Sequence, residues 1–486
     1  MDGMIDTVLI DGVTPECRVA LLNRSSLIDF HVHRPGKTVR AGDVIMGRVK
    51  AVVPSVQGAF VEIGDHRDGF LSFPEKTTQP PVREGEAVIV QVRHQAMAEK
   101  GARLTSRISL QGRYVVYTPD KPGVNASRKA GDPELAHRAV EAVKAVVGGD
   151  GGSDGAIIRT AALLLGADGT DLAVTEVASL RDAWQQANVH SESARLKPPH
   201  CLISALDPVF QMLLDLEYEH VRRIVVEGSD MFLRVRDYLE RSIPELLGFL
   251  ESYQGASSGI MEVEGVEEAV DAALRHRVAL PSGGCLHIHE TPACVTIDVD
   301  TDSAASSHAG KARDLIRHTN AEAADALMHA LRLRNLSGLI VVDFICDGDR
   351  DAGRSLLEQL SAAASNDPYP IEVAGFTRSG LVEMTRRRRS TSLPDMLMDR
   401  TASDSGSPDR GKSVETMAYD ALRRLHHGAL ATPGKPLSIC ASADVIALLQ
   451  GGLGAALREM KASVGVAVTL EIAPGMRHDM MDVYSS

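Results

Sequence analysis

The sequence predicts a mixed α/β protein built from several domains, one of which is a small β-barrel. Its 486 residues correspond to about three folding units at roughly 150 residues each. Apolar and polar residues alternate with a period of two from the N-terminus to about Gln111, as in antiparallel strands. Beyond that point, strand-like and helix-like segments alternate, which is typical of α/β domains.

The segments predict the elements in order. Residues 1–38 contain short antiparallel strands, and Ala41–Gln111 contains five segments at the spacing of a small barrel. These five are VIMGRVKAVV, GAFVEIG, DGFLSF, AVIVQVRH and ARLTSRISL. The helical pattern ELAHRAVEAVKAVV and a Gly-rich break follow, and the next segment, AIIRTAALLL, is predicted to be an apolar strand.

The second half of the chain continues this alternation. A helix over DPVFQMLLDLEYEHV and a strand over RRIVVEG precede a helix with Ser229 as its N-cap. PSGG at 281–284 introduces the hairpin GCLHIHE–TPA–CVTIDVD. A long helix over about 312–335 precedes the buried strand GLIVVDFI. A polar linker at 400–411 leads to a small C-terminal α/β unit.

Composition excludes several classes of protein. Hydrophobic residues make up 44% and charged residues 24%, as in ordinary globular proteins. No apolar run approaches the ~18 residues of a membrane span, and the N-terminus has no signal-peptide pattern, so we expect a cytoplasmic protein. Six scattered cysteines without a C-x-x-C pair indicate reduced thiols rather than a zinc site. The net charge of −13 argues against bulk-charge coating of nucleic acid but allows local basic grooves.

The strongest candidate site consists of carboxylates on two strands. Asp298 and Asp300 are two residues apart, so a strand points both to one face. Asp343 stands in an otherwise apolar strand, where an ionised aspartate is rare without a partner or a cation. Side by side, these strands would offer hard oxygen ligands for magnesium, which activates water and stabilises charge on a phosphodiester. The alternative is that the aspartates cap turns at strand ends.

Aromatic and basic residues are interleaved in the barrel segment. They are Phe60, Phe70 and Phe73 with Lys50, Arg67 and Lys100. Exposed rings on an OB-type barrel stack single-stranded bases while the cations follow the phosphates. The alternative is that the rings fill the barrel core.

Three shorter signals remain. Arg159 and Thr160 offer a guanidinium and a hydroxyl to a phosphate, or Arg159 is simply a surface residue. The run Arg386–Arg389 is either solvated or contacts an RNA backbone. Two His-x-His pairs have strand spacing and are predicted to line one strand face each rather than bind metal: His31 with His33, and His287 with His289.

Taken together, these segments resemble the ribonuclease E/G family over nearly the whole chain. The likeness rests on a colinear series: GRVKAVVPSVQGAFVEIG with DGFL, EKGARLTSRISLQGRY, AIIRTAA, LPSGG, TIDVDTD, HTNAEAADALMHALRLRNLSGLIVVDFI and GFTRSGLVEMTRRR. Such a series is far more specific than any single motif. The chain is similar to the G type, so we expect a protein without the long disordered scaffold tail of the E type.

The resemblance implies a fold of several α/β subdomains. An RNase H-like subdomain would be split by an inserted OB-fold barrel of the ribosomal-protein S-one type and a 5′-sensor. A DNase I-like catalytic subdomain and a small α/β C-terminal domain would follow. The expected boundaries are 1–38 and 205–282 for the RNase H-like parts, 39–115 for the barrel, 116–204 for the 5′-sensor, 283–399 for the catalytic subdomain, 400–413 for the linker and 414–486 for the C-terminal domain.

The resemblance also implies an activity. We expect a magnesium-dependent endoribonuclease that cleaves single-stranded, AU-rich RNA, favours a 5′-monophosphate and leaves 5′-phosphate and 3′-hydroxyl ends. It would act in rRNA and tRNA processing and in mRNA decay. The residues that match the family's motifs are Asp298 and Asp343 for magnesium, Arg159 and Thr160 for the 5′-phosphate, and Phe60, Phe70, Lys100 and Arg378 for RNA. Asp300, beside the metal aspartates, is a further candidate catalytic residue.

Three positions depart from the family pattern. Asp300 stands where the family has Asn, and an ionised aspartate accepts hydrogen bonds but donates none, so it either alters the alignment of the metal aspartates or becomes a third ligand. Cys346 replaces a further aspartate. The linker at 400–413 lacks the cysteines that share zinc between subunits, so zinc is not expected and a homodimer would form without it. A non-catalytic RNA-binding paralogue, or an RNA chaperone acting through the barrel, therefore stays open.

Overall fold

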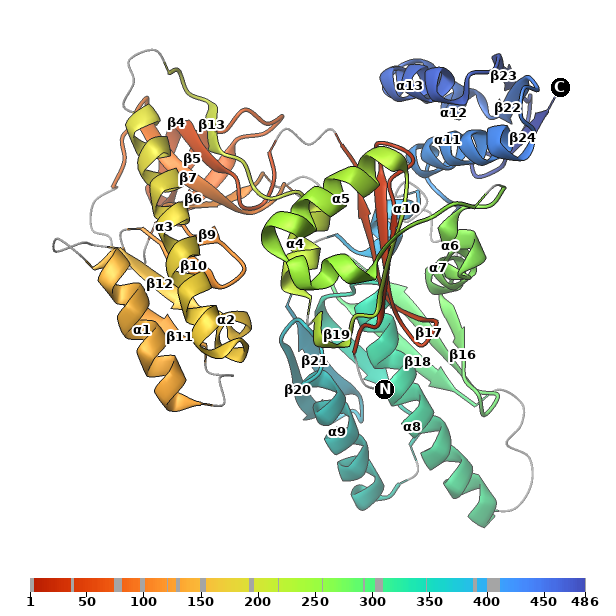
Figure 1. Ribbon diagram of the computed structural model, residues 1–486. Coiled ribbons are helices and arrows are strands. Elements are labelled where there is room, and N and C mark those ends of the chain that lie inside the picture. The colour runs from red at the N-terminus through yellow and green to blue at the C-terminus, as the bar shows by residue number, and fades with distance from the viewer. Residues whose placement is uncertain are drawn as a thin grey trace. The chain divides into compact units, whose positions relative to one another are not determined.

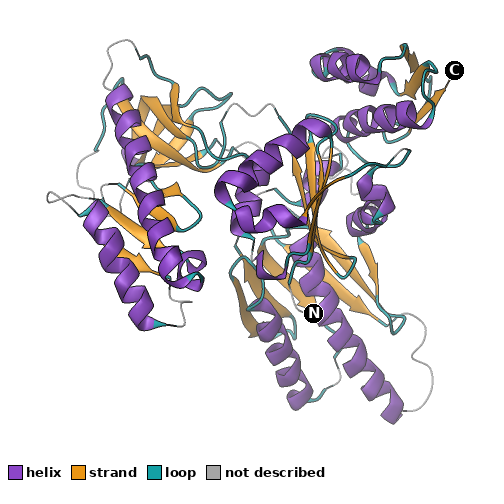
Figure 2. Ribbon diagram, viewed as in Figure 1, coloured by secondary structure: helices purple, strands orange, loops and turns teal. Residues whose placement is uncertain are grey.

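The computed structural model shows a mixed α/β protein whose described strands form five sheets (Figures 1 and 2). The chain divides into two compact units, Gly36–Asp215 and Met1–Pro35 with Leu216–Ser486. The structure describes residues 4–35, 39–73, 81–96, 101–119, 121–127, 132–148, 154–191, 196–216, 218–255, 257–291, 293–301, 309–346, 348–387, 391–399 and 411–485, and of 309–312 only the backbone.

Five strands of the unit Gly36–Asp215 close a barrel. In hydrogen-bonded order they are β4 (Val44–Val53), β5 (Gly58–Glu62), β6 (Gly69–Ser72), β8 (Arg103–Thr105) and β7 (Ala87–His94). Pairing of β4 with β7 closes the ring, and β13 (His200–Ile203) adds to β4 outside it. Val49, Val61 and Val90 point into its buried core. The predicted OB-like barrel is therefore confirmed as a closed five-stranded barrel.

A second sheet of the same unit packs against two helices. Its order is β11 (Gly123–Ala126), β12 (Gly155–Ile158), β10 (Val115–Thr118) and β9 (Leu110–Gln111), and the helices are α1 (Pro133–Val147) and α3 (Gly166–Ser191). The prediction of one strand over AIIRTAALLL is wrong, because β12 ends at Ile158 and helix α2 (Thr160–Leu164) begins at Thr160. Ala and Leu are strong helix formers, so an apolar run of them is ambiguous.

The first sheet of the other unit combines distant parts of the chain. Its order is β15 (Leu250–Ser252), β14 (Arg223–Glu227), β1 (Thr7–Asp11), β2 (Cys17–Asn23) and β3 (Ser26–His33). The predicted antiparallel strands are confirmed, and β1 also pairs with β14 in parallel. Helix α5 (Ser229–Ser242) is capped by Gly228 rather than by Ser229 as predicted. Gly228 has φ of 101°, a left-handed conformation that favours glycine, and a Cβ there would lie 2.8 Å from the Gly12 carbonyl oxygen.

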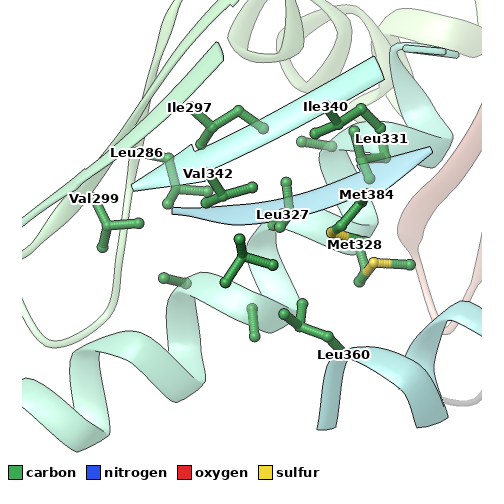
Figure 3. Close-up of a cluster of buried hydrophobic side chains, with 14 of the residues drawn as sticks. Leu286, Ile297, Val299, Leu327, Met328, Leu331, Ile340, Val342, Leu360 and Met384 are labelled. Atoms are coloured by element: carbon green, nitrogen blue, oxygen red, sulfur yellow. The ribbon is translucent and has the colours of Figure 1, made fainter. Parts of the chain in front are cut away.

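In the next sheet, the helices that the structure describes cover one face only. Its order is β16 (Arg277–Ala279), β17 (Cys285–Glu290), β18 (Val295–Asp300), β19 (Gly338–Asp343), β21 (Val382–Arg386) and β20 (Ile371–Phe376). The predicted hairpin and long helix are confirmed as β17–β18 and α8 (Ala309–Leu333). Figure 3 shows the core under α8 and α9 (Arg350–Ala364), where Leu327, Leu331 and Leu360 face the buried strand residues. The opposite face remains open, because β18 alternates buried and exposed residues along its whole length.

The predicted C-terminal α/β unit is confirmed. Strand β22 (Leu437–Ala441) pairs with β23 (Val468–Ile472) and β24 (Met481–Ser485), and the helices are α11 (Val414–Ala431), α12 (Ala443–Gln450) and α13 (Gly454–Val464).

Buried charges join α11 to the N-terminal strands. We call Asp11, Glu16, Arg18, Arg34 and Arg423 the junction cluster. Arg423 lies 2.8 Å from Asp11 and 2.5 Å from Glu16, Arg18 lies 2.8 Å from Asp11, and Arg34 also pairs with Glu16. Burial alone would raise the pKa of Asp11, but the guanidiniums of Arg18 and Arg423 outweigh it and hold that pKa at about 2.

Candidate active site and RNA-contacting surfaces

Two aspartates lie side by side on the open face of the sheet that contains β18 and β19. The two strands are parallel, and Asp298 is in register with Asp343. Neighbouring strands are about 4.8 Å apart, so the two carboxylates lie close together. Asp300 follows two residues later and points to the same exposed face. The fold thus brings together three carboxylates that the sequence places on two separated strands.

The expected burial of Asp343 is wrong. Asp343 is the last residue of β19 and is exposed, because helices cover only the opposite face of this sheet. The turn-capping alternative also fails for Asp298 and Asp343. Among the described residues, neither the Asp298 nor the Asp343 side chain has a hydrogen-bond or ion-pair partner. Two adjacent carboxylates without a cation repel each other, which makes a positively charged ligand favourable here.

The segment that follows β19 is tied to helix α8. The Asn320 side-chain amide donates to the Ile345 carbonyl oxygen at 2.8 Å, and its oxygen accepts from the Ile345 N–H at 3.1 Å. Arg317 forms an ion pair with Asp349 at 2.6 Å. Both contacts hold the chain just after Asp343. Asn320 belongs to the segment HTNAEAAD that carries the family resemblance, but nothing in the sequence indicated that its side chain anchors the segment that follows β19.

Arg378 lies at the same edge of the sheet as Asp343. It is exposed in the turn between β20 and β21, which is closed by the Thr377 N–H donating to Leu381 at 2.7 Å. Strand β21 runs antiparallel to β19 with Val382 opposite Val342, so this turn adjoins the end of β19. The turn therefore presents a cation beside the aspartate pair.

The Arg386–Arg389 run does not act as one RNA-contacting surface. Arg386 is buried, pairs with Asp367 at 3.2 Å, and lies 5.0 Å from the Tyr369 ring centroid. Its Nη1 also donates to the Leu336 carbonyl oxygen. Both alternatives, a solvated side chain and an RNA contact, are therefore wrong for Arg386, which is structural. Arg387 is exposed, and the last two arginines lie outside the described residues.

The barrel carries an aromatic pair on its surface. Phe60 is 41% exposed, and its ring meets the half-buried Phe70 edge-on at 5.5 Å between centroids. Gly58 makes room for this arrangement, since a Cβ there would collide with the Phe70 ring. Phe73 instead packs against the barrel core, as the alternative for the three rings predicted.

The cations predicted to accompany these rings differ in their surroundings. Lys50 is exposed but pairs with Asp68 at 3.2 Å and Glu62 at 3.4 Å. Arg67 is exposed. Lys100 lies outside the described residues.

Arg159 and Thr160 occupy the junction of β12 and α2. The Arg159 guanidinium donates to the Gly112 carbonyl oxygen at 2.8 Å and to the Asp215 carboxylate at 2.6 Å. Thr160 and Ser127 share a hydrogen bond of 2.9 Å between their hydroxyls. The guanidinium is half-exposed and held in place on two sides. Asp215 stands 56 residues away in sequence, and no local pattern indicated this partner.

Each His-x-His pair lies along one strand face, as predicted. His31 and His33 are on β3, with ring centroids 6.3 Å apart. His287 and His289 are on β17, on the open face of the sheet, where His287 is in register with Asp298. A third ring, from His276, lies near both.

Comparison with known proteins identifies the family. The model of the Ribonuclease E/G family matches residues 109–389. The chain belongs to this family. It is 32% identical to Ribonuclease G of Escherichia coli K12 over 98% of this chain and 99% of that protein. It is 34% identical to Ribonuclease G of Haemophilus influenzae over 86% of each chain, and 28% identical to Ribonuclease E of the same organism over 85% of this chain and 45% of that protein.

Two further properties concern only the part of the chain that the structure describes. None of its helices combines the length and the apolarity that a membrane span requires. None of its groups of three or more His, Cys, Asp or Glu side chains is arranged to hold a metal ion.

Proposed function

We propose that this protein is a magnesium-dependent endoribonuclease that cleaves single-stranded, AU-rich RNA in RNA processing and decay. It favours substrates with a 5′-monophosphate and leaves 5′-phosphate and 3′-hydroxyl ends. The observation that carries the proposal is the in-register pair Asp298 and Asp343, exposed and without partners among the described residues, in a chain of the ribonuclease E/G family.

The aspartate pair fits magnesium by its chemistry. Magnesium prefers hard oxygen ligands and is typically held by one or two carboxylates, with waters and phosphate oxygens completing its shell. Asp298 and Asp343 would hold the ion. When bound, magnesium supplies an activated water and stabilises charge on the phosphodiester. The exposed Arg378 in the adjoining turn would contact the RNA strand near the phosphate that is cut.

The other surfaces have separate parts in the proposal. Phe60 and Phe70 stack bases of the strand on the barrel, and Lys100 contacts its backbone. Arg159 and Thr160 bind the 5′-monophosphate. In the proposed division of the chain, the sheet with β18 and β19 belongs to a DNase I-like catalytic subdomain. The sheet with β1 and β14 belongs to a split RNase H-like subdomain, and the sheet with β12 to a 5′-sensor. The protein acts in the cytoplasm and forms any homodimer without zinc.

Cleavage of matched RNAs tests the proposal. A short AU-rich single strand with a 5′-monophosphate and its 5′-hydroxyl twin are incubated with magnesium and the wild-type protein, Asp343→Asn, Arg159→Gln or Arg138→Gln. Arg138 is exposed on α1 of the same unit and serves as the matched control. We expect faster cutting of the monophosphate twin, loss of cutting in Asp343→Asn, and loss of the preference alone in Arg159→Gln. Equal cutting by wild type and Asp343→Asn would refute the assigned metal site.

Asp300 supports a second candidate, an RNA-binding protein that does not cut. A third carboxylate on the same face adds negative charge near the scissile phosphate, and aspartate cannot donate the hydrogen bond that asparagine would. Tight binding of both RNAs without cleavage by wild type would favour this candidate. Cleavage gained by Asp300→Asn would then identify Asp300 as the cause.

A further inference from the structure

Three histidine rings gather beside the aspartate pair, on the open face of the sheet. The His276 ring is near-parallel to those of His287 and His289, with interplanar angles of 29° and 25° and centroid distances of 6.3 and 5.7 Å. We call these three residues the histidine platform. His289 is exposed and the other two are half-buried, so a π-face of the platform is accessible from solvent.

The platform is fixed by the backbone and by one neighbouring side chain. The Ile288 N–H donates to the His276 carbonyl oxygen at 2.8 Å, which holds His276 against β17 although it precedes β16. The Cys285 Sγ lies 3.3 Å from His287 Nε2 and fixes that ring. The exposed Arg277 stands opposite His287 on β16. The rings are thus held in place before any ligand arrives, which lowers the entropic cost of binding.

The platform adjoins the proposed catalytic aspartates directly. His287 is in register with Asp298, and His289 with Thr296, on neighbouring strands of the same face. Two residues along a strand span about 7 Å. The three rings therefore extend along the face from the aspartate pair, over a distance suited to a nucleotide next to the bound phosphate.

The arrangement of the rings favours a planar ligand over a metal ion. A metal requires ring nitrogens that converge on one point. Within the described part of the chain, no group of three such side chains is placed to hold a metal. Histidine rings stack well on unpaired RNA bases.

We propose that the histidine platform is a binding subsite for an unpaired nucleobase next to the scissile phosphate. This inference rests on the proposed function, because it takes the strand bound at Asp298 and Asp343 to be RNA. The subsite holds the base by its face, so it tolerates different bases while positioning the phosphate over the aspartates.

Abasic substitution in the RNA tests this subsite. A short single-stranded RNA whose cleavage position has been mapped is prepared with one abasic nucleotide at each position around the cut. Affinities in magnesium are measured by fluorescence anisotropy in the Asp343→Asn background, which leaves the RNA intact. These affinities are compared with those of the Asp343→Asn protein that also carries His289→Ala, His289→Phe or His31→Ala. His31 is the matched control because it belongs to the other His-x-His pair, on β3, where its ring stacks on that of His33.

The expected result is a loss of affinity that depends on both the base and the ring. His289→Ala should weaken binding of intact RNA about 5- to 30-fold. An abasic nucleotide at one position beside the cut should lower the affinity of the Asp343→Asn protein for the RNA by the same factor. The two losses should not add, because each removes the same stacking contact. His289→Phe should retain affinity, and His31→Ala should change nothing. In the cleaving protein, His289→Ala should raise KM more than it lowers kcat.

Three results would overturn the subsite. Equal losses in His289→Ala and His289→Phe would mean that a charge or hydrogen bond, rather than stacking, holds the strand. An abasic penalty that persists unchanged in His289→Ala would place the base elsewhere. Loss of binding on adding a chelator selective for zinc-type metals would mean that the histidines act through a metal. Failure of the background protein to bind any RNA would overturn the proposed function as well, so the two failures are distinguishable.

Discussion

Carboxylates of this protein occupy two opposite environments. In the junction cluster, Asp11 and Glu16 are nearly inaccessible, with side chains 2% and 1% exposed, and each is paired with two arginines. At the open sheet face, Asp298 and Asp343 are exposed and, within the described residues, have no partner at all. Proximity of acidic residues therefore does not by itself distinguish a structural cluster from a functional one. The difference lies in whether the chain itself supplies the balancing cations.

The two environments predict opposite consequences of substitution. A buried charge that loses its partner costs stability, since nothing else solvates it. An exposed carboxylate that binds a ligand costs little stability when removed, and the loss appears in activity.

The largest effect is expected from the exposed aspartates. Asp298→Asn and Asp343→Asn should each lower the cleavage rate about 1,000-fold or more, because the metal supplies several kcal/mol of charge stabilisation. The double variant should be little worse, since either change disables the same site. Thermal unfolding should stay unchanged or shift upwards, as repulsion between like charges is relieved. A marked fall in Tm would show that the pair is structural.

The next effect is expected from the buried arginine. Arg423→Met leaves Asp11 and Glu16 each short of a partner and should lower the free energy of unfolding by about 3 kcal/mol. Arg424→Met is the matched control, because Arg424 is the exposed neighbour on the same helix. Unfolding midpoints of both variants are measured in urea. Specific activity of the folded Arg423→Met protein should be retained, and an unchanged midpoint would contradict the assigned role of the cluster.

The junction cluster also predicts how stability depends on pH. The Asp11 carboxyl has a pKa of about 2 in the folded protein and so stays ionised there, whereas in the unfolded chain the same carboxyl takes up a proton near pH 3.8. Stability from this group is therefore fully present above about pH 4 and is lost as the pH falls towards 2, by about 2 kcal/mol in total. Unfolding of wild type and Asp11→Asn is followed from pH 5 to 2. The variant should show a flatter profile, and parallel profiles would count against the ion pairs.

The smallest effect is expected from a carboxylate that is exposed, like the aspartate pair, but ion-paired, like the junction cluster. Asp215 is exposed yet paired with Arg159, and Gln211 also donates to it at 2.9 Å. A 5′-phosphate must share the guanidinium with this carboxylate. Asp215→Asn should therefore raise the preference for 5′-monophosphate RNA about two- to fivefold, which corresponds to the free energy that an exposed ion pair contributes. Ratios of initial cleavage rates measure this preference. A reduced preference would mean that Asp215 orients Arg159 rather than competing with the phosphate.

Local patterns predicted most of the fold. The alternation in VIMGRVKAVV places β4 from Val44 to Val53, and the hairpin and long helix near Asp298 follow from turn residues and periodicity. Helix α3 was not predicted, because its polar sequence lacks a strong apolar face and only contacts with other elements define it. Gly228 was overlooked as a cap, since its need for a positive φ depends on the approach of Gly12.

The sequence predicted how the aspartates are placed on their strand but not what surrounds them. Spacing indicated that Asp298 and Asp300 share a face. Whether that face is buried depends on which side the helices cover, and this information is absent from the strand itself. The partners Asp215, Asn320 and His276 come from other elements, and nothing in the local sequence marks them.

Strand β1 pairs in parallel with β14, and Arg423 contacts Asp11 across 412 residues of chain. During synthesis the first strands therefore leave the ribosome long before their neighbours exist. At 5–20 residues per second, Asp11 waits about 20 to 80 s for Arg423. The unit Gly36–Asp215, by contrast, is continuous in sequence and is complete as soon as it emerges. The inserted unit can therefore fold while the N-terminal strands still lack β14 and Arg423.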